Sequence, residues 1–197
     1  MLKQQSQRRK DNSILLEAKG IGISNFKNNV VTFIPGEITA LSLRKLSALT
    51  EMPKQDEYIH IITKNAVNSF DFIAAIADKE IILNLYIAVY RIGKKVINTI
   101  KSIQDQGRIN KITFLVNDGY PKMQREGWNV LKSHESEKWQ IKIENNHAKV
   151  IAIKTDSNNY VIEGSGNLSI NARIEQYLFA NSEGLYKFHE QWINEIN

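Results

Sequence analysis

The chain has 197 residues, of which 42% are apolar and 24% charged, as expected for a globular protein with room for one well-cored domain. It contains no cysteine, which excludes thiol nucleophiles, disulfides and cysteine-based zinc sites. A formal net charge of +5 favours anionic partners such as nucleic acid, although charge alone does not identify a partner.

The first residues are basic and polar. Residues 1–12, MLKQQSQRRKDN, have no apolar segment behind them, so we expect a flexible basic tail and not a secretory signal. The most apolar stretch, residues 81–92, contains Asn84 and Arg91 and is shorter than the roughly 18 apolar residues of a membrane helix. We therefore expect one domain over residues 13–197, a cytoplasmic location and no membrane partner.

The pattern is weak up to about residue 50. Residues 13–26 and 28–34 have the composition of short strands interrupted by glycines and an Asn-Asn turn. Residues 38–52 place apolar side chains at helical spacing, which predicts a helix that ends before Pro53.

Strands and helices then alternate regularly. Apolar and β-branched runs predict strands over residues 57–63, 80–90, 111–117, 139–145, 147–155, 159–166 and 175–181. Amphipathic periodicity predicts helices over residues 68–79, 93–107, 120–133 (with a weak point at Gly127) and 182–196. This order predicts an α/β fold with a mixed, largely parallel sheet sandwiched between helices.

One predicted hairpin carries most of the chemical information. Strands 147–155 and 159–166 flank the turn sequence DSNN, so they are expected to pair antiparallel. His147 and Lys149 are two residues apart and project to the same face of the first strand. The second strand ends in Gly-Ser-Gly-Asn at residues 164–167, which the hairpin brings to the same end of the sheet.

These side chains suit a phosphate ester. A neutral imidazole, here that of His147, is a competent nucleophile near pH 7 and donates a proton when charged. The ammonium of Lys149 can hold a phosphate oxygen, and the Ser165 hydroxyl and Asn167 amide can donate hydrogen bonds to others. His-x-Lys and Gly-Ser-Gly-Asn are each weak signals, but their joint occurrence on paired strands rarely arises by chance.

The arrangement resembles the phospholipase D superfamily, whose signature is His-x-Lys, an acid, and then Gly-Ser-x-Asn. The matching residues are His147, Lys149, Gly164, Ser165 and Asn167. The resemblance implies a phospholipase D-like α/β domain, a phosphohistidine intermediate and no metal or other cofactor. It also implies a carboxylate that orients the nucleophilic histidine, for which Glu175 is the candidate.

The chain contains one such motif. In-line displacement at phosphorus needs a nucleophile on one side and a proton donor on the other, so one histidine cannot fill both roles at once. Enzymes of this superfamily use two motifs. We therefore expect a homodimer in which His147 of each subunit faces the other across the twofold axis.

Three functions remain open. The basic balance and the single motif favour a metal-independent nuclease that cleaves DNA or RNA. A lipid phosphodiesterase or phosphatidyl transferase would need an apolar groove or a membrane-facing surface. The acid expected five residues after the lysine is replaced by Lys154, and the nearest acid is Asp156 in the turn. This departure leaves open a non-catalytic nucleic-acid-binding module.

The other histidines are given structural roles. His60 is expected to be a core or edge residue of its strand, His134 to lie in a polar loop, and His189 to face solvent or cap a contact on the last helix. None has metal-like spacing with another histidine or an acidic pair, so we expect no metal site.

A cluster of cations follows the strand over residues 80–90. Arg91, Lys94 and Lys95 either contact a phosphate backbone or form the solvated start of a helix.

Overall fold

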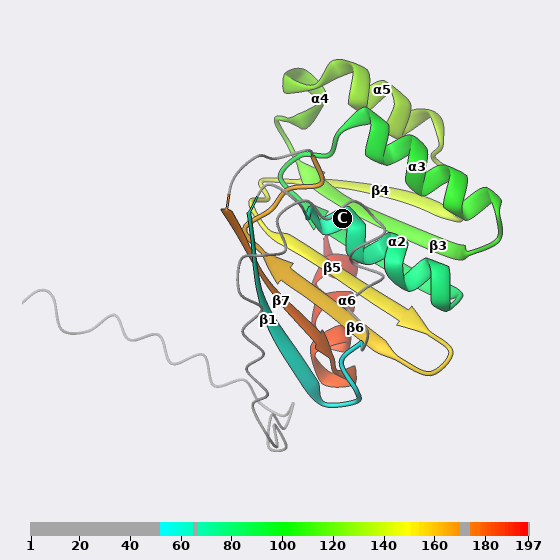
Figure 1. Ribbon diagram of the computed structural model, residues 1–197. Coiled ribbons are helices and arrows are strands. Elements are labelled where there is room, and N and C mark those ends of the chain that lie inside the picture. Colours follow the sequence, from blue (N-terminus) through cyan, green and yellow to red (C-terminus); the bar gives the residue numbers. More distant parts are fainter. Residues whose placement is uncertain (1–51, 65–66, 170–173, 197) are drawn as a thin grey trace, which may run out of the picture.

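A single sheet runs through the described part of the chain, which in this computed structural model comprises residues 52–64, 67–169 and 174–196. The expected tail, the first two strands and all but Met52 of the first helix lie outside these residues. The strands are ordered β1-β7-β6-β5-β2-β3-β4 across the sheet (Figure 1). Their bounds are β1 Glu57–Lys64, β2 Ile82–Val89, β3 Ile109–Asn117, β4 Trp139–Glu144, β5 Lys149–Thr155, β6 Asn159–Gly164 and β7 Ile174–Asn181.

The sheet is mixed, but the expectation that it is largely parallel is wrong. Within the described sheet, β2 and β3 pair in parallel, as do β3 and β4, and the remaining neighbours pair antiparallel. Parallel pairing requires a long crossover connection, and here helices follow β2 and β3. The chain instead passes from β4 to β5 and from β5 to β6 through short connections, and β5 lies beside β2.

Helices pack on both faces of this sheet (Figure 1). Their bounds are α2 Ser69–Lys79, α3 Lys94–Asp105, α4 Tyr120–Met123, α5 Arg125–Ser133 and α6 Glu183–Glu195. Alternate residues of β2 separate the two layers. Leu85 and Ile87 belong to the core shared with α2 and α3, whereas Tyr86 and Ala88 pack with α6. No helix in residues 52–64, 67–169 or 174–196 combines the length and apolarity needed to cross a membrane.

The helix expected over residues 120–133 is interrupted, but not at Gly127. It divides into α4 and α5 at Gln124, whose backbone has φ −135° and ψ 61°. Gly127 lies inside α5, and a Cβ placed there would be 2.6 Å from the hydroxyl of Tyr120. Glycine therefore allows close packing against the buried Tyr120 ring, and it does not weaken the helix at that point.

Two buried amides attach the start of β5 to the ends of its neighbours. Asn146 is 7% exposed, and its Nδ2 donates to the carbonyls of Val89, at 3.3 Å, and Leu115, at 3.2 Å. Its Oδ1 accepts from the N–H of Ala148 at 2.8 Å. The backbone oxygen of Asn146 accepts from Asn117 Nδ2 at 3.1 Å. The backbone on either side of His147 is thereby fixed to β2 and β3.

The opposite end of the β5–β6 hairpin is held by a carboxylate from another part of the chain. Glu80, which caps the end of α2, accepts hydrogen bonds from Thr155 Oγ1 at 2.6 Å, Asn158 Nδ2 at 3.0 Å and Tyr160 Oη at 2.9 Å. Burial raises the pKa of Glu80, but these hydrogen bonds outweigh it and hold the pKa below its usual range. Glu80 thus supplies a carboxylate that holds this hairpin, in which Lys154 stands at the position where the motif would have an acid.

The substitution Glu80→Gln tests this brace. We expect it to lower the free energy of unfolding by about 1–2 kcal/mol at pH 7, because three donors lose a charged acceptor. The lowered pKa of Glu80 means that its contribution is present above the ordinary value of 4.5 and is lost as the pH falls through the folded-state value. Urea unfolding should therefore show a smaller difference from wild type at pH 3.5 than at pH 7. Glu137→Gln, at an exposed glutamate, is the matched control; equal losses in both variants would contradict the account.

Asn146→Ala tests the attachment at the other end. It leaves two buried carbonyls and one N–H without their partner, so we expect a loss of about 2–3 kcal/mol in the free energy of unfolding. The neighbouring Asn145 is exposed, and Asn145→Ala is expected to cost less than about 0.5 kcal/mol. Urea unfolding of both variants measures the difference, and similar stabilities would show that Asn146 does not hold the strand ends.

Candidate functional site

The candidate residues gather at one end of the strands of the sheet. β2 and β6 finish at this end, and β5 and β7 begin there, because Val89 pairs with Lys149 and Val150 pairs with Glu163. His147 lies three residues before Val150, and Gly166 lies three residues after Glu163, so the hairpin register brings His147 level with Gly166. Residues 147–149 and 164–167, distant in sequence, therefore share one end of the hairpin.

His147 and Lys149 are in direct contact. The Lys149 ammonium lies 3.4 Å from Nδ1 of the exposed His147 ring and donates to the His147 carbonyl at 2.9 Å. Burial lowers the pKa of Lys149, nearby Arg91 acts in the same direction, and Glu175 opposes them. The site thus holds an imidazole beside a half-buried cation, a combination that attracts an anion and offers it a nucleophile.

Tyr90 is a site residue that the sequence analysis gave no role. Its ring packs on His147 with the ring centroids 5.0 Å apart and the planes 57° from each other. The Tyr90 hydroxyl donates to the sulfur of Met123 at 3.6 Å, and the Met123 side chain is 53% exposed. Tyr90 directly follows β2, whose last residue pairs with Lys149, so its position is set by the pairing of β2 with β5. That long-range pairing left no local signal in the sequence.

Ser165 and Glu175 interact with each other. The Ser165 hydroxyl donates to the Glu175 carboxylate and accepts from the N–H of Gln176 at 3.1 Å. Glu175 is 6% exposed, and its charge acts to raise the pKa of Lys149. Glu175 therefore bonds to the serine of the second half of the motif and acts electrostatically on the lysine of the first half.

The loop that carries Asn167 is held closely against the core. A Cβ on Gly166 would lie 2.2 Å from the hydroxyl of Tyr177, so only glycine fits there without a shift. The Gly166 carbonyl accepts from Ser69 Oγ, at the start of α2, at 2.8 Å. Asn167 is half-buried, and its Oδ1 is shielded from solvent without a hydrogen-bond partner among the described residues. A shielded polar atom of this kind commonly marks a place for a water or a ligand.

The remaining histidines have structural contacts. His60 lies exposed on the edge strand β1, and His134 packs against the Trp139 ring at the end of α5. Of the two alternatives expected for His189, facing solvent is wrong, because the residue is 4% exposed, and it is engaged in contacts instead. α6 packs on the sheet, which places His189 Nε2 2.7 Å from a carboxylate oxygen of Glu163, while Trp192 Nε1 donates to His189 Nδ1 at 2.9 Å.

Comparisons with known proteins inform the fold. No protein-family profile and no curated protein sequence matches the chain. Among solved structures it is similar to polyphosphate kinase from Porphyromonas gingivalis, with a TM-score of 0.54 and 11% identity over 71% of this chain and 26% of that one. It also matches phosphatidylserine synthase from Haemophilus influenzae (TM-score 0.49, 10% identity, 70% of this chain and 38% of that one).

A third match is TrmBL2, an archaeal chromatin protein, with a TM-score of 0.47 and 12% identity over 69% of this chain and 50% of that one. The chain therefore spans about a quarter to a half of the length of these proteins. At such low identity the likeness to polyphosphate kinase concerns the fold alone. That fold is a mixed α/β arrangement consistent with the phospholipase D-like domain that the motif implies.

Proposed function

We propose that the protein is a metal-independent phosphodiesterase, a nuclease that cleaves DNA or RNA through a phosphohistidine and acts as a homodimer. The observation that carries this proposal is the contact of the His147 imidazole with the Lys149 ammonium, at the end of the hairpin that also holds the Ser165–Glu175 pair and Asn167. Phosphoryl transfer requires a nucleophile, a cation and a hydrogen-bond donor close together. His147, Lys149 and the side-chain amide of Asn167 would supply them at this end of the hairpin.

In the first step, a His147 imidazole attacks phosphorus through Nε2, because Nδ1 lies against Lys149. Binding of the substrate phosphate draws the ammonium toward a non-bridging oxygen, so that Nδ1 can hold the ring proton while Nε2 forms the new P–N bond. The bond from phosphorus to the leaving oxygen breaks, and that oxygen takes a proton from a second imidazole. Lys149 and Asn167 stabilise the charge on the non-bridging oxygens.

In the second step, the second imidazole, now neutral, takes a proton from a water molecule. The water oxygen attacks phosphorus, the P–N bond breaks, and His147 returns to its starting state with the phosphate monoester released. Glu175 is the proposed group that orients the nucleophilic ring, in keeping with the negative charge it adds to the site. Both histidine roles are filled by His147 when two subunits meet at a twofold axis.

A nucleic acid suits this site better than a lipid. The chain carries an excess of five positive charges, and Arg91 lies close enough to Lys149 to act on its pKa. The large apolar side chains exposed on the described surface are Ile81, Met123, Ile143 and Phe188, each between 39% and 53% exposed. An acyl chain or membrane surface would call for a contiguous apolar patch.

The direct test is turnover by a His147→Ala variant. We expect cleavage of labelled single- and double-stranded DNA or RNA by the wild type in the presence of EDTA, and a loss of at least about a thousandfold in the variant, because the nucleophile is removed. His60→Ala, at another exposed histidine, is the matched control and is expected to keep full activity. Cleavage by His147→Ala at the wild-type rate, or head-group release from a phosphatidyl substrate without nucleic-acid cleavage, would contradict the proposal.

The shared site is tested with mixed dimers. Dimers that contain one wild-type and one His147→Ala subunit, purified through two different tags, keep one imidazole where the chemistry needs two. We expect them to lose at least about a hundredfold in turnover, as for removal of a general acid. Independent active sites would instead leave half of the wild-type rate, and an active monomer in sedimentation would equally rule out a site made by two subunits.

A further inference from the structure

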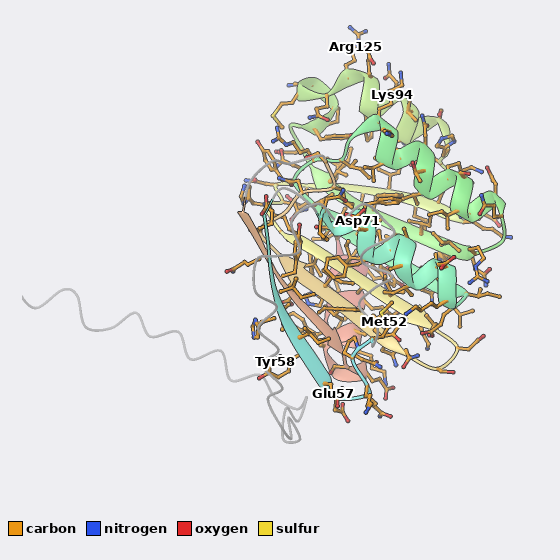
Figure 2. The ribbon with its side chains drawn as sticks, in the orientation of Figure 1. Met52, Glu57, Tyr58, Asp71, Lys94 and Arg125 are labelled. Atoms are coloured by element: carbon orange, nitrogen blue, oxygen red, sulfur yellow. The ribbon has the colours of Figure 1, made fainter. Side chains whose placement is uncertain are left out.

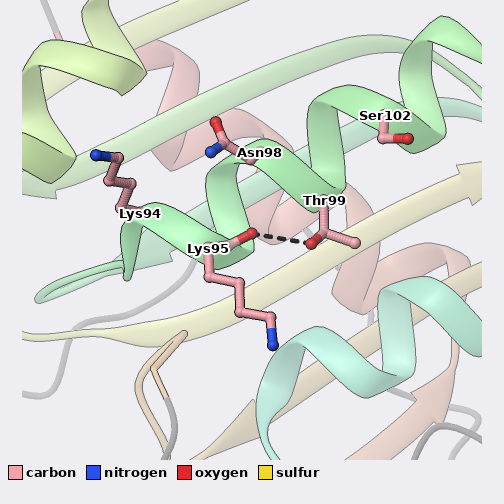
Figure 3. Close-up of a pocket in the computed structure, with 5 residues that line it drawn as sticks. All are labelled: Lys94, Lys95, Asn98, Thr99 and Ser102. Atoms are coloured by element: carbon pink, nitrogen blue, oxygen red, sulfur yellow. Dashed lines mark hydrogen bonds between the residues drawn. The ribbon is translucent and has the colours of Figure 1, made fainter.

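An open, shallow groove lies along α3, close to the candidate site but separate from it. Its volume is about 570 Å³, and it is lined by Lys94, Lys95, Asn98, Thr99 and Ser102 (Figure 3). These positions are four residues apart in two rows on one side of the helix, while the opposite side, with Val96, Ile97 and Ile100, is buried on the sheet. The groove is therefore a continuous strip of α3.

The lining is suited to an anion. Every side chain in it ends in an ammonium, an amide or a hydroxyl, and none is acidic or aromatic. Lys95 is exposed, and Lys94 projects outward from α3 (Figure 2), 3.5 Å from the exposed carboxylate of Glu126. Thr99 donates its hydroxyl proton to the Lys95 carbonyl at 2.9 Å. The Lys94 and Lys95 side chains point away from each other (Figure 3), and Lys95 has no acidic partner among the described ion pairs.

The position of the two lysines costs stability within the helix itself. The first turn of α3 contains no acid, whereas α2 and α6 begin with Asp71 and Glu183. Cations at a helix N-terminus are unfavourable because the macrodipole is positive there. Glu126 offsets part of this cost for Lys94, and an anion bound beside Lys95 would relieve the rest.

The groove adjoins the candidate site through the backbone. The N–H of Gly93 donates to the Leu168 carbonyl at 2.9 Å, and Ile92 forms a β-bridge with Leu168, the residue after Asn167. Arg91 lies near enough to Lys149 to lower its pKa. Cationic side chains therefore lie both at the candidate site and at the start of the groove.

We propose that the α3 groove binds the backbone phosphates of a nucleic-acid strand that flanks the phosphodiester at His147. This proposal rests on the proposed function, which supplies the chemistry of the strand. Lys94 to Ser102 spans about 12 Å of helix, the length of about three to four nucleotides at 3.4 Å each. A nucleic-acid strand bound in the groove would place its scissile phosphate at His147 and its neighbouring phosphates beside the lysines.

The test measures binding in a His147→Ala background, so that it does not depend on turnover. Binding of a fluorescein-labelled 24-nucleotide single strand is followed by anisotropy at several salt concentrations, with and without Lys95→Glu. The control is Lys111→Glu, which reverses the charge of an exposed lysine near the start of β3. This residue lies at the opposite end of the strands from His147. We expect Lys95→Glu to weaken binding about tenfold and to reduce the slope of log Kd against log salt by about 1.

Lys111→Glu is expected to change the affinity less than about twofold. Equal losses in the two variants would show that only net charge matters, and no loss with Lys95→Glu would show that the strand does not use the groove; either result overturns the proposal. Binding of phosphatidylglycerol vesicles that depends on Lys95, without such dependence for the oligonucleotide, would overturn it in favour of a membrane surface. Lys95-dependent binding together with no cleavage of the strand by the wild-type protein would instead count against the proposed chemistry alone.

Discussion

The side chain of Asn146 is the constraint on which the candidate site depends. Its amide joins the carbonyls of Val89 in β2 and Leu115 in β3 to the N–H of Ala148, just before β5, so the backbone on both sides of His147 is tied to the sheet. A buried amide of this kind is stabilising only while all its partners are in place. The position of an exposed imidazole is thus determined by a neighbour that is almost completely buried.

The electrostatics of the candidate site follow from the position of His147. Lys149 is partly desolvated, Arg91 adds to the positive potential, and Glu175 with Ser165 provides the balancing negative charge. Two further lysines, Lys94 and Lys95, line the α3 groove. Such a balance favours an anionic ligand at this end of the sheet, as the proposed phosphodiester substrate requires.

Much of the fold follows from local pattern, and the prediction of a mixed α/β class is confirmed. The apolar run of β2 and the amphipathic stripe of α3 are visible in the sequence because burial imposes their periodicities. The pairing of β5 with β2 is not visible, since it joins segments about sixty residues apart, and this is why the sheet was expected to be largely parallel. Glu80, Asn146 and Tyr90 were missed for the same reason: each acts on residues remote in sequence. The roles of His147, Lys149, Ser165, Asn167 and Glu175 remain proposals.

The central claim is that His147 bonds covalently to phosphorus. The most direct measurement is mass spectrometry of the protein quenched in alkali during turnover of a DNA or RNA substrate, followed by peptide mapping. The account predicts a phosphoryl or nucleotidyl adduct on the peptide that contains His147, absent from the His147→Ala variant. Turnover without an adduct, or an adduct on another residue, would contradict it.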